Sequence, residues 1–127
     1  MTYHIGHVYG GPERYPRLTL DLSRKLVAAL RRCGASDELV RALDWNHPAY
    51  RFWPHAPFAF ASEDDWPVPA LPNGDYYIFV DPDLTFGVLG HRWEKTMCIF
   101  GQRLLEAFSL DLPSLFDRPN RIGGKVV

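Results

Sequence analysis

The sequence predicts an α+β fold, and three observations carry that prediction. Apolar residues recur at helical spacing between residues 18 and 33, six prolines interrupt the chain between residues 48 and 72, and short apolar runs alternate with turn signals after residue 72. Early helices followed by short strands with tight links are typical of helices packed on an antiparallel sheet. At 127 residues the chain has the size of one domain, so we treat residues 1–127 as a single unit.

The first half is expected to supply two helices. Residues 1–17 are expected to form an extended arm or edge strand, from Tyr3 to Tyr9, that runs into a loop. Leu22, Leu26 and Leu30 then share one face of a predicted helix over 21–33, which the glycine that follows would end. A serine with two acidic residues after it favours a second, shorter helix over 37–43.

The second half is expected to supply the sheet. Because proline removes a backbone donor, only short extended pieces are expected in the middle of the chain, at 50–53 and more weakly at 58–61. Strands at 75–80, 84–89 and 95–100, joined by short links, predict a three-stranded antiparallel meander over about 75–100. One C-terminal helix should follow at 102–108, and the tail from Pro113 is expected to be loose.

Composition and charge narrow the classes of function. Fourteen basic and fifteen acidic side chains give a net charge of −1, which argues against a nucleic-acid partner. Residues 61–100 hold seven acidic and two basic groups, so this segment favours a cationic ligand or a basic protein, unless its acidic residues are only a solvated loop. We expect a cytoplasmic, soluble protein with no signal peptide and no membrane partner, in which Cys33 and Cys98 are buried thiols.

The strongest candidate site lies at the turn that joins the last two strands of the meander. His91 and Glu94 are three residues apart, and Trp93 between them would exclude water from the pair. A carboxylate beside an imidazole can orient it for general acid–base catalysis. The simpler interpretation is a turn histidine bonded to backbone, with Glu94 facing solvent. The surroundings are unusually rich in rings, because residues 45–100 hold all four tryptophans and 13 of the 18 aromatic residues.

Three further residues are candidates for positioning a ligand. Asp75 and Tyr77 would add a carboxylate and a phenol to the same site, although Asp75 could instead accept backbone hydrogen bonds within its turn. Arg51 lies among apolar residues and should find an acidic partner, for which Asp75 and Glu94 are candidates. Its guanidinium could alternatively bind a substrate carboxylate or phosphate. Trp66 and Trp93 would form the walls.

Neither a metal nor another cofactor is expected. The histidines, cysteines and carboxylates show none of the short spacings of common zinc sites. The sequence also lacks a glycine-rich phosphate loop and a nucleophile at a sharp turn of the nucleophile-elbow type.

The same stretch resembles a bacterial family known as domain-of-unknown-function family 2716. The segments that carry the resemblance are Trp66-Pro67-Val68-Pro69, Pro72 to Phe79, Asp83-Leu84, Phe86-Gly87, Gly90-His91, Trp93-Glu94 with Thr96, Cys98 to Gly101, and Trp45 to Phe52. The resemblance covers roughly residues 43–106 and implies no particular activity. It implies that the Gly-Asp-Tyr-Tyr and His-x-Trp-Glu pieces occur together, which favours one shared site. Where this chain has Arg92, the family usually has proline, so the turn here is less rigid.

Two functions from different classes remain open at this point. The first is a small-ligand-binding protein with an aromatic-walled acidic pocket for a small polar or cationic molecule, acting as an acid–base isomerase, cyclase or lyase through His91 and Glu94. The second is a protein-interaction module, such as an antitoxin or immunity-type protein, that binds a basic partner through exposed tryptophans. A concave site around His91 and Glu94 would favour the first function. A flat patch with exposed tryptophans would favour the second.

Overall fold

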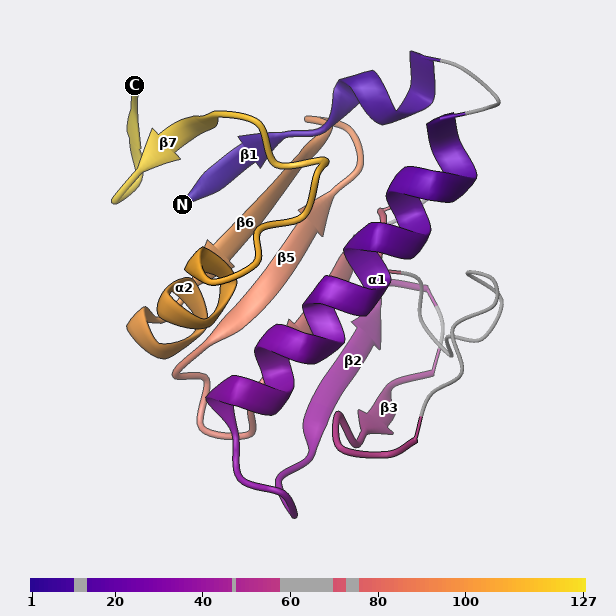
Figure 1. Ribbon diagram of the computed structural model, residues 1–127, viewed down its shortest axis with the longest axis vertical. Coiled ribbons are helices and arrows are strands. Elements are labelled where there is room, and N and C mark those ends of the chain that lie inside the picture. The colour runs from indigo at the N-terminus through magenta and orange to yellow at the C-terminus, as the bar shows by residue number, and fades with distance from the viewer. Residues whose placement is uncertain (11–13, 47, 58–69, 73–75) are drawn as a thin grey trace.

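The computed structural model describes residues 1–10, 14–46, 48–57, 70–72 and 76–127 (Figure 1). Within these ranges the fold is α+β, as the sequence predicts: two α-helices and a short 3-10 helix accompany one antiparallel sheet of eight strands. The strand order is β3-β2-β4-β5-β6-β1-β7-β8. In chain order the elements are β1 (Thr2–His4), η1 (Gly6–Gly10), α1 (Arg14–Cys33), β2 (Val40–Asp44), β3 (Tyr50–Phe52), β4 (Tyr77–Val80), β5 (Gly87–His91), β6 (Thr96–Phe100), α2 (Gln102–Ser109), β7 (Pro119–Ile122) and β8 (Lys125–Val126).

Helix α1 lies across one side of the sheet, and α2 packs against α1 on that same side (Figure 1). The buried face of α1 carries Leu22, Leu26 and Leu30, each at most 1 % exposed. The helix begins at Arg14 rather than at residue 21. Pro16 is tolerated there because the first turn of a helix does not use its backbone donors.

The second helix that the sequence predicts, over 37–43, does not form. Residues 40–44 are strand β2, which is hydrogen-bonded to β3 on one side and to β4 on the other. Val40 and Ala42 are buried while Arg41 between them is exposed, which is the period of two of a strand. Seven residues are also too few for a helix to be stable without strong tertiary support.

The chain ends differ from the sequence expectations as well. Strand β1 ends at His4, and residues 6–10 form the 3-10 helix η1 in place of an arm reaching Tyr9. The tail is not loose throughout, because β7 pairs with β1 and β8 pairs with β7. Leu115 and Phe116 just before β7 are buried in the core, where the Phe116 ring stacks on Tyr3 at 4.6 Å.

The link between β4 and β5 is longer than the sequence suggests. Asp81 accepts hydrogen bonds from the backbone N–H groups of Thr85 (2.6 Å) and Phe86 (3.0 Å), and from the Thr85 hydroxyl. Burial alone would raise the pKa of Asp81, but these hydrogen bonds outweigh it and hold the pKa below its usual value. Leu84 takes a positive φ of 59° in this turn, so β5 begins at Gly87 rather than at residue 84.

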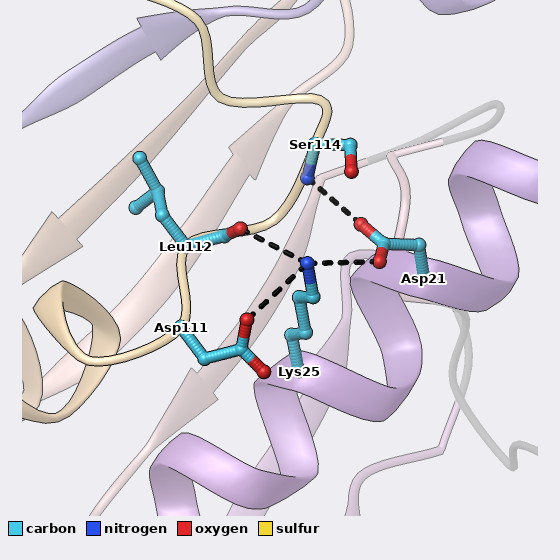
Figure 2. A network of polar contacts seen from close by, with 5 residues as sticks. All are labelled: Asp21, Lys25, Asp111, Leu112 and Ser114. Carbon is cyan, nitrogen blue, oxygen red and sulfur yellow. Dashed lines mark hydrogen bonds and ion pairs between the residues drawn. The ribbon is translucent and has the colours of Figure 1, made fainter.

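A polar network fastens α1 to the segment that follows α2 (Figure 2). The Lys25 ammonium contacts the carboxylates of Asp21 at 3.0 Å and Asp111 at 3.4 Å, and donates to the Leu112 carbonyl at 3.2 Å. Asp21 also accepts a hydrogen bond from the Ser114 backbone N–H. The network therefore holds the chain in position where it turns from α2 toward β7. Neither α-helix has the length and apolarity that a bilayer crossing needs, within the residues described.

Candidate functional site

The second side of the sheet carries no helix among the described residues, and we call it the open face. Directly opposed residues on neighbouring strands share a face of the sheet. The strand register therefore shows which side chains form a row across the open face. Its middle row runs across β2, β4, β5 and β6 through Leu43, Ile78, Leu89 and Cys98. All four are partly exposed, and none belongs to the helix-side core. The open face therefore presents a band of apolar side chains.

One end of the open face is closed by an aromatic ring packed on glycine. Val80, Gly87 and Phe100 are opposed across β4, β5 and β6. A Cβ at Gly87 would come within 2.6 Å of the Phe100 ring, so the ring lies directly on the glycine. Val80 beside it is only 5 % exposed, yet it is not part of the helix-side core. A Cβ at position 87 would also lie 2.5 Å from the Phe79 carbonyl oxygen, a backbone atom that cannot easily move, so a glycine is needed there.

The other end of the open face holds an aromatic row. The Tyr76 ring meets the His91 ring edge-on at 4.8 Å and the Trp45 ring edge-on at 6.0 Å. Trp45 continues β2, and its backbone N–H donates to the Tyr76 carbonyl at 3.2 Å. Its side chain is 76 % exposed, which is unusual for a tryptophan, a residue that is highly buried on average.

His91 and Glu94 are close, but their side chains serve different partners. The Nδ1 atom of His91 accepts a hydrogen bond from the backbone N–H of Glu94 at 3.1 Å. This bond makes Nδ1 the acceptor and puts the proton of the neutral imidazole on Nε2. The sequence allowed two arrangements for His91, a catalytic pair with Glu94 or a turn histidine bonded to backbone. The contact of Nδ1 is that of a turn histidine bonded to backbone.

The Glu94 carboxylate is held on its other side by two described groups. It accepts hydrogen bonds from the Arg121 guanidinium of β7 and from the Thr96 hydroxyl at 2.9 Å. These two contacts lower the pKa of Glu94 to about 2. A carboxylate that acidic is ionised at neutral pH and is a weak base, so it suits an ion pair better than proton transfer.

The predicted site residues do not all meet on one face. Tyr77 is opposed to Gly90 on the helix side and is 7 % exposed, so it lies on the other side of the sheet from His91. Tyr76 takes the position beside His91 instead. Trp93 is 71 % exposed, and the Arg92 guanidinium lies over its ring at 5.3 Å. The predicted ligand residue Asp75 and wall residue Trp66, with the weak strand at 58–61, lie outside the described residues.

Arg51 faces another arginine rather than a carboxylate. It lies in β3 directly opposite Arg41 of β2, and both side chains are exposed. Of its two expected partners, Glu94 is engaged by Arg121, and Asp75 is outside the described residues. Among the described residues, neither arginine has an ion pair. The sheet therefore carries two adjacent positive charges at one corner of the open face.

Two cavities lined by described residues lie elsewhere. One of about 420 Å³ is lined by Arg32, Cys33 and Arg103 with neighbours on α2, and one of about 380 Å³ by Glu38, Asp81 and Arg103 with neighbours on the β4–β5 link. Neither is lined by His91, Glu94 or Trp93. Cys33 is buried and unpaired, and burial raises the pKa of its thiol, whereas Cys98 is free and only partly buried. Across the described ranges no three His, Cys, Asp or Glu side chains cluster as metal ligands would.

Comparison with known proteins identifies the family. The sequence profile of the family described as "Protein of unknown function (DUF2716)" matches residues 1–105. The chain belongs to this family. The chain is also similar to "Uncharacterized protein YxiI" of Bacillus subtilis (strain 168), with which it is 40 % identical over 96 residues. That match covers 76 % of this chain and 59 % of the relative, so the chain spans about three-fifths of the relative's length. No solved structure matches the chain.

Two residues of the open face were not singled out by the sequence interpretation. Arg41 lies in the segment 37–43 for which the sequence predicts a helix, and the sequence favours Tyr77 rather than Tyr76 as the site tyrosine. The signal that places Arg41 is the alternation of Val40, Arg41 and Ala42, which fits a strand with one exposed side. No short-range signal reveals that Arg41 opposes Arg51, because that follows only from the pairing of β2 with β3.

Proposed function

We propose that this DUF2716 protein is a protein-interaction module that binds a partner protein through the open face of its sheet. The observation that carries the proposal is the aromatic row beside an apolar band. Trp45, Tyr76 and His91 lie next to Leu43, Ile78 and Leu89 on a side of the sheet where no described helix packs. Trp45 is exposed and Tyr76 is partly exposed, and tryptophan and tyrosine are among the side chains that dominate binding energy at protein interfaces.

The contacts of His91 and Glu94 give less support to an acid–base enzyme. His91 uses Nδ1 to accept the Glu94 backbone N–H, and the Glu94 carboxylate is occupied by Arg121 and Thr96. Catalysis through this pair would require the carboxylate to leave Arg121 and reach the imidazole. In the proposed module the turn has a simpler role, because it fixes the His91 ring against Tyr76 and presents Trp93 to a partner.

The proposal is tested by photo-cross-linking from defined positions in cells that express the protein. A benzophenone amino acid at Leu89, in the middle of the open face, should cross-link one specific protein. The same group at Leu110, which is exposed just after α2, is the matched control and should not. The cross-linked protein is then purified and titrated against wild-type and variant chains by calorimetry.

The titration tests whether the open face binds the partner protein. Trp45→Ala should weaken binding of the purified partner by about 2 kcal/mol, as at an interface hot spot, without moving the thermal midpoint. Leu110→Ala should leave the affinity unchanged. If Leu89 and Leu110 give the same cross-links, or if Trp45→Ala binds as tightly as wild type, the open face is not the binding surface and the proposal fails.

A further inference from the structure

The corner of the open face formed by β2 and β3 carries an electrostatic feature that the proposed function does not itself explain. Arg41 and Arg51 are direct cross-strand neighbours, so their Cβ atoms are separated by roughly 5 Å. Like charges at directly opposed positions destabilise a sheet. In the described part of the chain no carboxylate pairs with either of them. The pair therefore costs the free protein stability that a bound anion would restore.

The backbone that carries Arg51 is anchored from behind. The Arg31 side chain of α1 donates hydrogen bonds to the carbonyl oxygens of Pro54 and Ala56, just after β3. The Trp53 indole N–H donates to the Ser36 carbonyl at 2.7 Å. These contacts leave the two exposed guanidinium groups on a fixed backbone, which lowers the entropy cost of holding an anion between them.

We propose that Arg41 and Arg51 bind carboxylates of the partner, and that the surface which docks on the open face is acidic. This inference rests on the proposed function and names the chemistry of its partner. Arg121 opposes Thr2, which in turn opposes Cys98, so it lies on the open face with Arg41 and Arg51. These three arginines and Glu94 are the described charged side chains of that face, a net charge of +2, and Glu94 is already paired with Arg121. Charge complementarity therefore selects an acidic partner, the reverse of the basic partner that the sequence favours. A planar guanidinium binds a carboxylate through two parallel hydrogen bonds, which makes the pair of arginines selective.

The probe is a glutamate octapeptide, titrated against the ¹⁵N-labelled chain at low salt and observed by NMR. Shifts should concentrate at the side-chain Nε–H signals of Arg41 and Arg51. The double variant R41Q/R51Q should bind the peptide at least about fivefold more weakly, as expected for two exposed charge pairs. The matched control R17Q/R32Q removes the same charge from exposed positions of α1 and should change the affinity little.

The thermal stability of R41Q/R51Q gives a second readout. If the two arginines only stabilised the fold, the double variant would be less stable than the wild type. Because R41Q/R51Q removes a repulsion, its thermal midpoint should equal or exceed that of wild type while its peptide affinity falls. A lysine octapeptide should not bind at this corner. A short thymidine oligonucleotide and inorganic phosphate are included because a guanidinium also binds phosphate.

Each outcome supports or overturns the inference. Equal weakening in both double variants would show non-specific attraction, and tighter binding of the oligonucleotide or phosphate at the same two arginines would assign the corner to phosphate. Either result overturns the carboxylate assignment, as does the absence of peptide binding. If R41Q/R51Q binds the cross-linked partner as wild type does while Trp45→Ala does not, only this inference fails and the interaction module stands. If Trp45→Ala also binds normally, the proposed function fails.

Discussion

At the scale of single residues, the ion pair of Glu94 with Arg121 predicts how the stability of the fold depends on pH. The Arg121 contact holds the pKa of Glu94 at about 2, below its ordinary value of 4.5. Because the folded-state pKa is depressed, the pair stabilises the fold above pH 4.5, and this contribution is lost as pH falls toward 2. Both side chains are about one-third exposed, so solvent screens the pair and its contribution to stability is small.

Arg121→Gln should therefore raise the pKa of Glu94 toward its ordinary value and flatten the acid limb of the stability curve. The pKa is measured by NMR titration of the Glu94 side chain, and the stability by urea unfolding between pH 2 and pH 6. Arg118→Gln, at an exposed position three residues earlier, removes the same charge and is the control. An unchanged Glu94 pKa in Arg121→Gln would show that the pair does not form.

Gly101 is a second residue whose conformation makes a prediction. It links β6 to α2 with φ of 89°, and a Cβ there would lie 2.4 Å from the Thr85 carbonyl oxygen and 2.5 Å from the Phe86 side chain. Gly101→Ala should lower the free energy of unfolding by about 2–3 kcal/mol, because positive-φ strain and a backbone clash act together. Gly123→Ala, at positive φ with no atom within 4 Å of its Cβ, carries the strain alone and should cost clearly less. Equal losses measured by urea denaturation would rule out the clash.

At the scale of elements, Lys25 tests how the helices are fastened to the rest of the fold. Its ammonium joins Asp21, Asp111 and the Leu112 carbonyl, and so ties α1 to the segment after α2 (Figure 2). Lys25→Met keeps the volume but leaves these acceptors without their donor. We expect a loss of about 1 kcal/mol in unfolding free energy, and faster hydrogen exchange around residues 111–114. Arg17→Met on the same helix is the control, and identical exchange in both variants would contradict the tie.

The elements also show what a sequence can and cannot specify. The long helix and the late helix were predictable because their apolar spacing repeats over several turns. The segment at 37–43 was not, because its short apolar pattern fits either a helix or a strand. Pairing with β3 and β4, which lies outside the local sequence, decides the outcome for Val40 and Ala42. Strand β7 was missed for the same reason, since it exists by pairing with β1 from the far end of the chain.

At the scale of the whole molecule, the candidate site was predictable in its location but not in its composition. The turn at His91 to Glu94 and the ring-rich strands were found from the sequence, and Trp93 is exposed there. Which side chains share a face depends on register, and a shift of one residue exchanges Tyr76 for Tyr77. The partners of Glu94 and Arg51 depend on strand order, which brings β7 near Glu94 and sets Arg41 across from Arg51.

At the scale of the whole molecule, strands from the two ends of the chain, β1 and β7, pair with each other in one half of the sheet. We therefore expect the C-terminal strands to protect the edge of β1. Strand β1 lies between β6 and β7, so removing residues 118–127 would leave its outer edge unpaired (Figure 1). Leu115 and Phe116 would remain, so the core should still form. We expect the truncated chain to fold but to lose about 2 kcal/mol, from a few backbone hydrogen bonds of about 1 kcal/mol each.

An exposed edge strand pairs with other chains, so the truncated protein should also associate as its concentration rises. Thermal unfolding followed by circular dichroism measures the loss, and light scattering measures the association. Arg121→Gln in the untruncated chain removes the ion pair but keeps the pairing of β7 with β1, and it should associate no more than the wild type does. If the truncated chain associates no more than the wild type and has an unchanged thermal midpoint, β7 does not protect β1. If Arg121→Gln associates as strongly as the truncation, the ion pair rather than strand pairing protects this edge.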